Sequence, residues 1–213
     1  MIRLHGYWRS SAAYRVRITL GLKGLEFEQI TYDLRQGEQR RADYLTLAPH
    51  GLVPALEADG VTLIESPAIL EWLEEQYPTP ALLPASAPDR AIVRAMAALI
   101  GCDIHPLNNL RVVKSLREDF AATPDQIDHW IAHWITTGFT ALETLIVRHG
   151  QSFAFGDVPT LADCFLVPQV YAALRFKVDL APFPRIAAAA ARANLIPVVA
   201  AAHPTKQPDS DPA

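Results

Sequence analysis

The pattern of hydrophobic residues changes once along this chain, and the change limits the folds that the chain can adopt. Before residue 78, short runs rich in β-branched and aromatic residues alternate with segments of helical periodicity. Beyond residue 89 the long segments have a helical pattern and no strand pattern recurs. The intervening stretch PTPALLPASAPD is rich in proline and poor in charge, which is typical of a linker between domains.

We therefore predict a sheet-containing domain over residues 1–80, a linker over 81–89 and an all-helical domain over 90–213. The final stretch HPTKQPDSDPA is polar and rich in proline, so the C-terminal tail is expected to fray. Within the second domain, helices are expected over about 90–119, 125–149, 160–176 and 183–202.

The first domain begins with a strand–helix–strand unit. Residues 2–7 and 27–34 have the composition of strands, and residues 11–23 between them place apolar side chains on one broad helical face. A helix that joins two neighbouring strands in this way is the crossover of a parallel pair. Arg15 and Arg17 in this helix are expected to be structural, on exposed or interface faces.

The same domain ends with a hairpin and a second helix. Asp59-Gly60 lies between two strand-like runs in residues 52–66, and this dipeptide is a strong signal for a hairpin turn. Residues 66–77 then have a helical pattern, with Ser66 as the expected N-cap and Pro67 in the first turn. The order βαβ followed by ββα predicts a small α/β domain.

The composition argues against several classes of function. The 213 residues carry a formal net charge of −4, which provides no basic surface for nucleic acid. No apolar run approaches the roughly 20 residues of a membrane span, and the N-terminus lacks the apolar core of a secretory signal. Cys102 and Cys164 are far apart, which argues against a disulfide framework, a zinc site and a CxxC motif. We expect a cytoplasmic protein without metal, nucleic-acid or membrane partners.

The dipeptide Ser10-Ser11 stands between the first strand and the first helix, where it has two interpretations. A serine at this place is a common N-cap, which is a structural role. The free N–H groups and the positive dipole end of the same helix also favour an anion, and a hydroxyl that donates to a sulfur there helps a thiol to ionise. No cysteine is nearby in the sequence, so such a thiolate has to belong to a ligand.

Two further pairs, Val53-Pro54 and Glu65-Ser66, also have a structural and a functional interpretation. A proline at the start of a strand is typical of an edge strand, and the backbone of Val53 can then pair with an extended, peptide-like ligand. Glu65 and the helix N-terminus at Ser66 can together bind the ammonium and the carboxylate of an amino-acid end. Each signal is weak alone, but all three pairs occur in order within one small domain.

With these features the chain resembles the zeta-class glutathione transferases, a family that includes the maleylacetoacetate and maleylpyruvate isomerases. The resemblance covers nearly the whole chain. It rests on WRSSAAYRVRITLGLKG, LVPALEADGVTLIESPAILEWLEEQYPTPALLP, GCDIHPLNNLRV, FGDVPTLADCFLVPQV and RFKVDLAPFPRI, which stand in the family's order. It implies the glutathione transferase fold, with a thioredoxin-like α/β N-terminal domain and an all-α C-terminal domain, a homodimer, and glutathione as cofactor.

The resemblance also implies roles for individual residues. Catalysis is expected to involve Arg9, Ser10 and Ser11, with one of the two serines supporting the glutathione thiolate. Val53 is expected to pair with the cysteinyl backbone before a cis Pro54, and Glu65 and Ser66 to hold the γ-glutamyl end. The candidates for contact with glutathione are Ser10, Ser11, His50, Val53, Pro54, Glu65, Ser66 and His105.

The chain departs from the family pattern at two positions. Maleylacetoacetate isomerases typically have a cysteine after the serine pair, where this chain has Ala12. The glutathione sulfur carries the chemistry, so this change loosens the assignment to the tyrosine pathway but leaves the catalytic prediction in place. A glutamine usually precedes the Val-Pro pair, and here Leu52 does, which makes His50 a candidate to reach glutathione instead.

Maleyl substrates carry carboxylates, which arginine binds through two parallel hydrogen bonds. Arg9 directly precedes the serines, and Arg175 matches a position that faces the active site in the family. Arg111 is a third candidate, with a solvent-exposed helix charge as its alternative. For His105 the alternative is a histidine of the core.

The predicted reaction is cis–trans isomerisation of maleylacetoacetate or maleylpyruvate to the fumaryl isomer, in the catabolism of tyrosine or gentisate. It proceeds by reversible addition of the glutathione thiolate to the double bond. Two alternatives stay open: conjugation or dehalogenation of small electrophiles, in which glutathione is consumed, and a glutathione-fold binding module without turnover. The sequence does not separate the two maleyl substrates.

Overall fold

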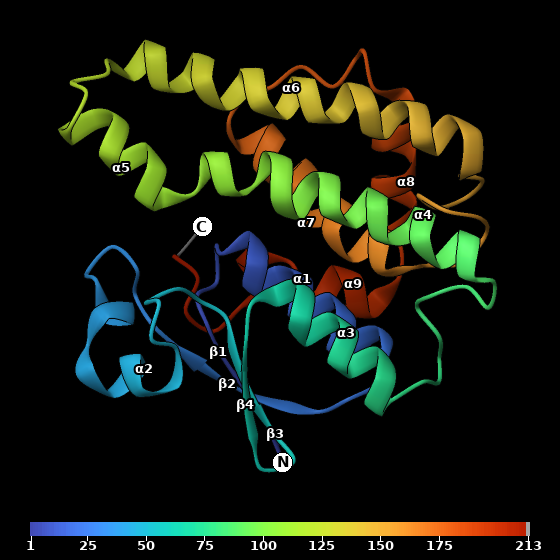
Figure 1. The fold of residues 1–213 in the computed structure, drawn as a ribbon, viewed down its shortest axis with the longest axis horizontal. Coiled ribbons are helices and arrows are strands. Elements are labelled where there is room, and N and C mark those ends of the chain that lie inside the picture. Colours follow the sequence, from blue (N-terminus) through green and yellow to red (C-terminus); the bar gives the residue numbers. More distant parts are fainter. Residues whose placement is uncertain (212–213) are drawn as a thin grey trace. The chain divides into compact units, whose positions relative to one another are not determined.

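Figure 1 shows the computed structural model of the chain, which describes residues 1–211. The chain divides into two compact units. The first comprises Met1–Leu82 together with the segment that begins at Asn194, and the second comprises Leu83–Ala193. The C-terminal segment thus belongs to the unit of the N-terminus, which differs from the predicted helical domain over 90–213.

The first unit is built on a four-stranded sheet with the strand order β2-β1-β3-β4. Strands β1 (Ile2–Gly6) and β2 (Phe27–Thr31) are parallel, and α1 (Ser11–Leu22) is the crossover between them. Strand β3 (Ala55–Ala58) is antiparallel to β1 and forms a hairpin with β4 (Val61–Ile64). The predicted strand–helix–strand unit, the hairpin and the α/β fold class are confirmed.

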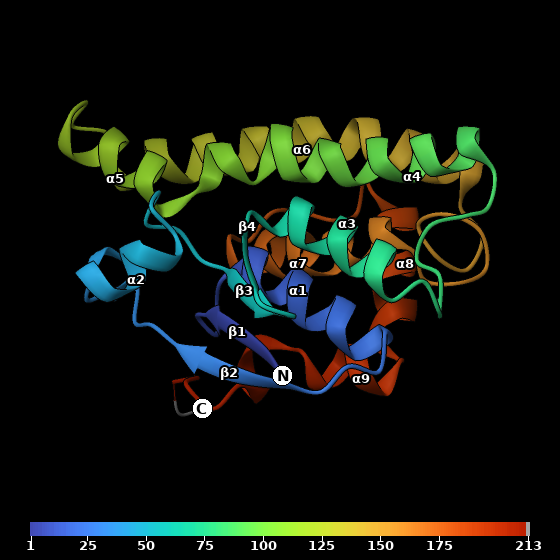
Figure 2. The same ribbon diagram turned by 60° about the horizontal axis from the view of Figure 1, so that its bottom comes forward.

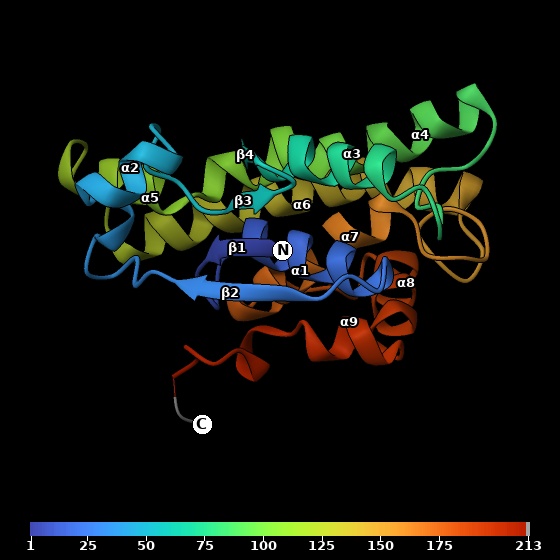
Figure 3. The ribbon, with the colours of Figure 1, turned by 90° about the horizontal axis from the view of Figure 1, so that it is seen from below.

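Helix α1 is the central helix of the first unit, because it contacts both α3 (Ser66–Gln76) and α9 (Pro197–Ala201), as Figures 2 and 3 show from two sides. A 3-10 turn at Glu38–Arg40 and α2 (Ala42–Leu47) follow β2. A second 3-10 turn at Pro204–Lys206 follows α9. Every long helix of this unit therefore packs against α1.

The core of the first unit consists of apolar side chains from β1, β3, α1 and α3. Burial of such side chains from water is the main favourable contribution to folding. The fully buried residues include Leu4, Val16, Leu20, Leu56, Ile69, Leu70 and Leu73. Arg15 and Arg17 were expected to be structural, on exposed or interface faces; each is only 2 % exposed, so the exposed alternative is wrong.

The second unit is helical in the part of the chain that the structure describes. It contains α4 (Ala87–Ala98), α5 (Leu110–Glu118), α6 (Pro124–His149), α7 (Leu161–Arg175) and α8 (Pro184–Asn194). Helix α4 packs against α7, and α5 packs against α6. Among the helices formed by residues 1–211, none combines the length and the hydropathy needed to cross a membrane.

The helix expected over 90–119 is interrupted, and that prediction is wrong. After α4 the backbone forms a π-helical turn at Leu99–Ile104, in which the His105 N–H donates to the Ile100 carbonyl at 2.9 Å, and then a 3-10 turn at Pro106–Asn108. Pro106 has no N–H to donate and its ring excludes the regular α-helical path, which is why the helix cannot continue. Helix α5 begins only after Asn109 caps it.

The tail that was expected to fray is held by the first unit as far as residue 211, so that prediction is wrong for residues 203–211; residues 212–213 of the tail lie outside the described residues. The backbone N–H of Trp8 donates to Asp209 at 2.9 Å, and Arg35 donates to Asp211 at 2.9 and 3.0 Å. A polar composition indicates a fraying end only where the polar groups find no partners, and here two carboxylates have them.

Candidate active site

The two serines at the start of α1 occupy different positions. Ser10 is the N-cap, and its Oγ accepts a hydrogen bond from the backbone N–H of Ala13 at 3.2 Å. Ser11 is the first residue of the helix, is partly exposed, and makes no side-chain hydrogen bond within residues 1–211. The capping interpretation is therefore correct for Ser10, while the hydroxyl of Ser11 remains able to donate.

The N-terminus of α1 is suited to a negative charge. The first turn carries no acidic side chain, so no carboxylate of the helix itself occupies the positive end of the helix dipole. A backbone hydrogen bond from Ser10 N–H to the Tyr7 carbonyl at 3.0 Å closes the turn that leads into the helix. We call residues 7–10 the active-site turn.

Arg9 lies in the active-site turn and is partly exposed. Its guanidinium lies 5.3 Å from the centre of the Trp8 ring, an arrangement in which the positive charge and the ring face attract each other. Burial raises the pKa of the neighbouring Tyr7 hydroxyl, and the charge of Arg9 opposes this rise. Arg9 thus places a cation directly beside the two serines.

The segment before β3 presents a free backbone edge. The Val53–Pro54 peptide is cis, as the resemblance implied. Within the described residues the backbone N–H and C=O of Val53 have no hydrogen-bond partner, so both can pair with an extended ligand. The preceding carbonyl, that of Leu52, accepts a hydrogen bond from the Tyr44 hydroxyl at 2.6 Å.

Tyr44 is a further candidate residue, beside the Val53 segment, that the sequence did not indicate. It is fully buried and forms a cluster with Ala48 and Ala55, against which Val53 packs. Burial raises the pKa of the Tyr44 hydroxyl, so this group stays protonated and donates at neutral pH. Tyr44 and Ala48 are four residues apart, a spacing that is typical of one face of a helix. The residues before them are polar and show no helical or strand periodicity, so this spacing alone did not indicate Tyr44.

Glu65 adopts an unusual backbone conformation at the start of α3. Its φ is +67° and its ψ is 112°, a combination that costs a non-glycine residue about 1–3 kcal/mol and is most often found at functional sites. The exposed carboxylate lies beside the His50 ring, with Oε1 and Nε2 3.5 Å apart. His50, the predicted substitute for the missing glutamine, is therefore next to Glu65.

Ser66 does not cap α3, so its predicted N-cap role is wrong. Glu65 occupies the N-cap position, and Ser66 is the first helical residue. The Ser66 hydroxyl is buried and accepts a hydrogen bond from Nη1 of Arg15 at 3.2 Å. A serine in this position still has its hydroxyl proton to donate, and it is held in place by a buried arginine.

The other candidates lie in the second unit. His105 is half-buried and ends the π-helical turn. Arg111 is exposed on α5, as its alternative interpretation as a helix charge expected. Arg175 is the last residue of α7, and its guanidinium lies 4.4 Å from the centre of the Phe176 ring. Their contact with a ligand stays a prediction.

The first unit therefore has a thioredoxin-like sheet, a cis proline before β3 and a helix N-terminus with an available hydroxyl. These are the features of a domain that binds a thiol-containing peptide. The family description "Glutathione S-transferase, N-terminal domain" matches residues 9–76. This match covers the active-site serines, the Val-Pro pair and the Glu-Ser pair.

Relatives match the chain over nearly its full length. A maleylpyruvate isomerase of a Ralstonia species is 49% identical over 212 residues, which cover 98% of this chain and 100% of the relative. A maleylacetoacetate isomerase of Pseudomonas aeruginosa is also 49% identical, over 98% of this chain and 99% of the relative.

Solved structures agree with these relatives. The holo structure of a bacterial zeta-class maleylpyruvate isomerase has a TM-score of 0.96 at 48% identity and covers 98% of this chain and 100% of its own. A maleylacetoacetate isomerase of Anaeromyxobacter dehalogenans with bound glutathione has a TM-score of 0.90 at 44% identity, over 99% and 98% of the two chains. The chain belongs to the zeta class of the glutathione transferases.

Proposed function

We propose that this protein is a glutathione-dependent cis–trans isomerase that converts a maleyl keto acid, maleylpyruvate or maleylacetoacetate, to its fumaryl isomer. The observation that carries the proposal is that the chain is 49% identical, over essentially its full length, to two enzymes named for this activity, a maleylpyruvate isomerase and a maleylacetoacetate isomerase. The identity is equal for the two names, so it does not favour one substrate over the other.

The residues of the first unit fit glutathione as the cofactor. The unpaired backbone of Val53 suits the cysteinyl residue, since a peptide pairs with an exposed edge through its own N–H and C=O. The Glu65 carboxylate, which lies beside His50, suits the ammonium of the γ-glutamyl end. The N-terminus of α3 and the Ser66 hydroxyl suit its carboxylate.

Ser11 is proposed as the residue that stabilises the thiolate, because its hydroxyl makes no side-chain hydrogen bond within residues 1–211 and is free to turn toward a ligand, whereas the cap bond from the Ala13 N–H restricts the orientation of the Ser10 hydroxyl. When bound, glutathione supplies a thiolate that adds reversibly to the maleyl double bond, so that this bond becomes single and can rotate before the thiolate leaves and the double bond forms again. The N-terminus of α1 and the Ser11 hydroxyl lower the pKa of a thiol placed there, since both interact more favourably with the charged form.

Arg9 is proposed to bind a substrate carboxylate, since it is the cation that directly precedes the serines. Arg175 and Arg111 are proposed for the same function, and His105 for contact with glutathione, on the resemblance alone.

If Arg175 binds substrate, Arg175→Ala raises KM for the maleyl substrate more than KM for glutathione. An unaltered KM for the maleyl substrate would show that the proposal for Arg175 is wrong.

The test of the proposed function is to follow the absorbance of maleylpyruvate and, in parallel, of maleylacetoacetate, with and without glutathione. Free thiol is measured at the end of each reaction. Glutathione-dependent conversion without loss of free thiol is the expected result, and the faster substrate identifies the pathway. Loss of thiol in step with turnover indicates conjugation, and retention on a glutathione matrix without any turnover indicates a binding module.

A cytoplasmic homodimer completes the proposal. The dimer follows from the resemblance, and size-exclusion chromatography with light scattering tests it. A mass near that of the 23.4 kDa chain would contradict it, while twice that mass is expected.

A further inference from the structure

We infer that the C-terminal segment, defined here as residues 202–211, positions the active-site turn, and that Asp209 is the residue through which it does so. The inference rests on the proposed function, because it assigns a role in that function to a part of the chain outside every motif considered so far. Asp209 is a positioning residue, since it acts through the backbone of Trp8.

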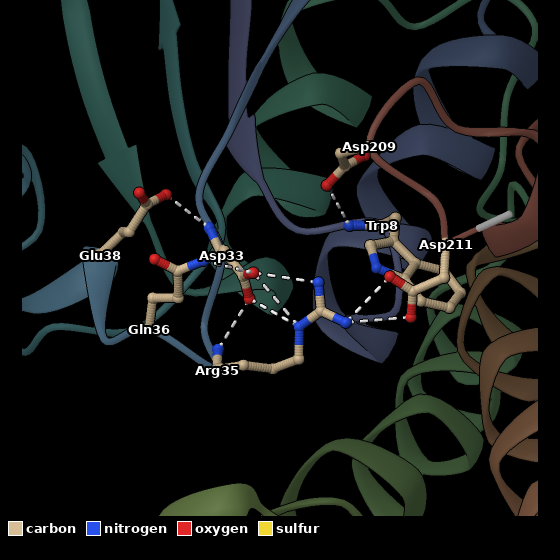
Figure 4. A network of polar contacts seen from close by, with 7 residues as sticks. All are labelled: Trp8, Asp33, Arg35, Gln36, Glu38, Asp209 and Asp211. Carbon is tan, nitrogen blue, oxygen red and sulfur yellow. Dashed lines mark hydrogen bonds and ion pairs between the residues drawn. The ribbon is translucent and has the colours of Figure 1, made fainter.

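The first contact is made by the Asp209 carboxylate, which Figure 4 shows pointing at the backbone nitrogen of Trp8. Oδ2 accepts the Trp8 N–H at 2.9 Å. Oδ1 lies 3.3 Å from Nε2 of Gln29, which donates to it from β2. A hydrogen bond to a charged acceptor is stronger than one between neutral groups, so this carboxylate ties the active-site turn to the sheet.

The second contact holds the other side of the same residue. The Trp8 carbonyl accepts a hydrogen bond from Nη2 of Arg17 at 2.9 Å. The same guanidinium donates through Nε to the carbonyl of Ala202 at 3.1 Å. Because Arg17 is buried, this bridge is shielded from water, and it fixes the beginning of the C-terminal segment against the turn.

A third contact anchors the end of the segment. In Figure 4 the guanidinium of Arg35 lies between two carboxylates, Asp33 and Asp211. Nη1 of Arg35 donates to both oxygens of Asp211, at 2.9 and 3.0 Å, while Nε and Nη2 donate to Asp33 at 2.9 and 3.0 Å. This pair is exposed, so we assign it the role of keeping Asp209 in place rather than a large contribution of its own.

These contacts matter for catalysis because of where Trp8 stands. The backbone N–H of Trp8 donates to Asp209 of the C-terminal segment, and its carbonyl accepts from Arg17, which also donates to Ala202 at the start of that segment. Trp8 is followed directly in the chain by Arg9 and by Ser10, the N-cap of α1. If the turn shifts, Arg9 moves and the direction of the first turn of α1 changes. A shift of the order of 1 Å in a catalytic group can cost about a hundredfold in rate.

The test compares Asp209→Ala with Asp209→Asn and with Glu143→Gln as matched control. The asparagine keeps an oxygen that can accept the Trp8 N–H. Glu143 is also an acidic side chain that accepts backbone N–H groups from a distant segment, Arg185 at 2.8 Å and Ile186 at 2.9 Å, but it belongs to the second unit. Circular dichroism and urea unfolding show which variants are folded.

Three quantities are measured for each folded variant: the pH profile of kcat/KM, KM for glutathione, and the pKa of the bound glutathione thiol from its ultraviolet absorbance. For Asp209→Ala we expect kcat/KM to fall about tenfold to a hundredfold at neutral pH. We also expect the thiol pKa and the acid limb of the profile to move to higher pH. Asp209→Asn is expected within about threefold of wild type, and Glu143→Gln is expected to leave thiol pKa and profile unchanged.

The inference is overturned if Asp209→Ala keeps the wild-type thiol pKa and pH profile and differs only in stability, as Glu143→Gln does. It is also overturned if Asp209→Asn is as impaired as Asp209→Ala. Failure of the proposed function has a different signature, namely a wild-type protein that binds glutathione but isomerises neither maleyl substrate. In that case the pKa of the bound glutathione thiol can still be measured in wild type and in Asp209→Ala, and the difference between them still tests the inference.

Discussion

Ser10 and Ser11 are neighbours in the sequence, but they differ in what their hydroxyls contact. Because Ser10 accepts the Ala13 N–H, Ser10→Ala is expected to cost about 1 kcal/mol of unfolding free energy. Because the Ser11 hydroxyl is available for the thiolate, Ser11→Ala is expected to raise the thiol pKa of bound glutathione. Below that pKa, each unit of rise lowers kcat/KM about tenfold.

Urea unfolding and the pH profile of kcat/KM separate the two effects. The expected pattern is a loss of stability in Ser10→Ala and a shift of the acid limb in Ser11→Ala. An acid limb that shifts in Ser10→Ala and stays in place in Ser11→Ala would reverse the assignment and make the cap residue the thiolate donor.

Tyr44 is predicted to govern affinity for glutathione without taking part in the reaction. Tyr44→Phe keeps the ring that packs in the cluster beside Val53 but removes the 2.6 Å hydrogen bond to the Leu52 carbonyl. Without this bond the segment before β3 is less ordered in the free protein, and the cost of ordering it on binding, up to about 1 kcal/mol, corresponds to a rise of up to about fivefold in KM for glutathione. kcat at saturating glutathione is expected to stay the same.

The control for this variant is Tyr32→Phe. The Tyr32 ring lies against the Tyr44 ring, with centres 4.5 Å apart, but its hydroxyl pairs with His5 at 3.0 Å and not with the segment before β3. An equal rise in KM for glutathione in both variants would show that the effect comes from the packing of the two rings.

At the scale of single elements, the local signals in the sequence were sufficient for the sheet domain. Asp59-Gly60 fixes the turn of the hairpin, and the pattern over 11–23 predicts α1 to within a residue. The interruption at Leu99–Ile104 was missed because a π-helical turn is short and adds only about one residue to the helical repeat, which does not stand out within a single turn of the pattern. The Pro106 beside it was the available signal, since proline ends or kinks a helix.

Helix α7 carries a buried carboxyl whose titration can be measured. Asp163 accepts the backbone N–H groups of Ala154 at 2.9 Å and Thr160 at 2.8 Å, which lower its pKa, but burial outweighs them and raises the pKa to about 6. The folded state therefore binds this proton more tightly than the unfolded state does. Its contribution to stability is fully present below about pH 4 and is lost as the pH rises through about 6.

Asp163→Asn is the variant that isolates this effect. The asparagine does not titrate, so the hydrogen bonds it loses lower the stability by an amount that is independent of pH. Relative to wild type, the unfolding free energy of the variant is expected to rise by up to about 3 kcal/mol between about pH 4 and pH 7. A difference between the two proteins that stays constant over this range in urea unfolding would contradict the prediction.

At the scale of the whole molecule, the sequence indicated the order of a sheet-containing part and a helical part but not the return of the chain. Asp209 and Asp211 stand in a polar, proline-rich tail, where composition alone predicts disorder. Their partners, Trp8 and Arg35, are 201 and 176 positions away in the sequence and carry no pattern that points to the tail. Contacts of this kind depend on the folded chain and cannot be inferred from local signals.

The first unit also depends on one buried ion pair that connects three segments. Nζ of Lys23, at the end of α1, donates to Oε2 of Glu74 in α3 and to the carbonyls of Tyr77 and Pro80, at 2.7 and 2.8 Å. The Lys23 side chain is fully buried and that of Glu74 is 7% exposed. The pair thus fixes the ends of both helices to the chain that leaves the unit.

Removing Lys23 takes away the cation that faces the buried Glu74 carboxylate, and breaking a buried pair in this way costs about 3–5 kcal/mol. We therefore expect Lys23→Met to lower the unfolding free energy by about that amount, in urea unfolding followed by circular dichroism. The double variant Lys23→Met/Glu74→Gln is expected to recover part of the loss, because no carboxylate is then buried without its lysine, while the amide oxygen can still accept the Leu82 N–H. Purely additive losses from the two single variants would show that Lys23 and Glu74 are not coupled, which would contradict the prediction.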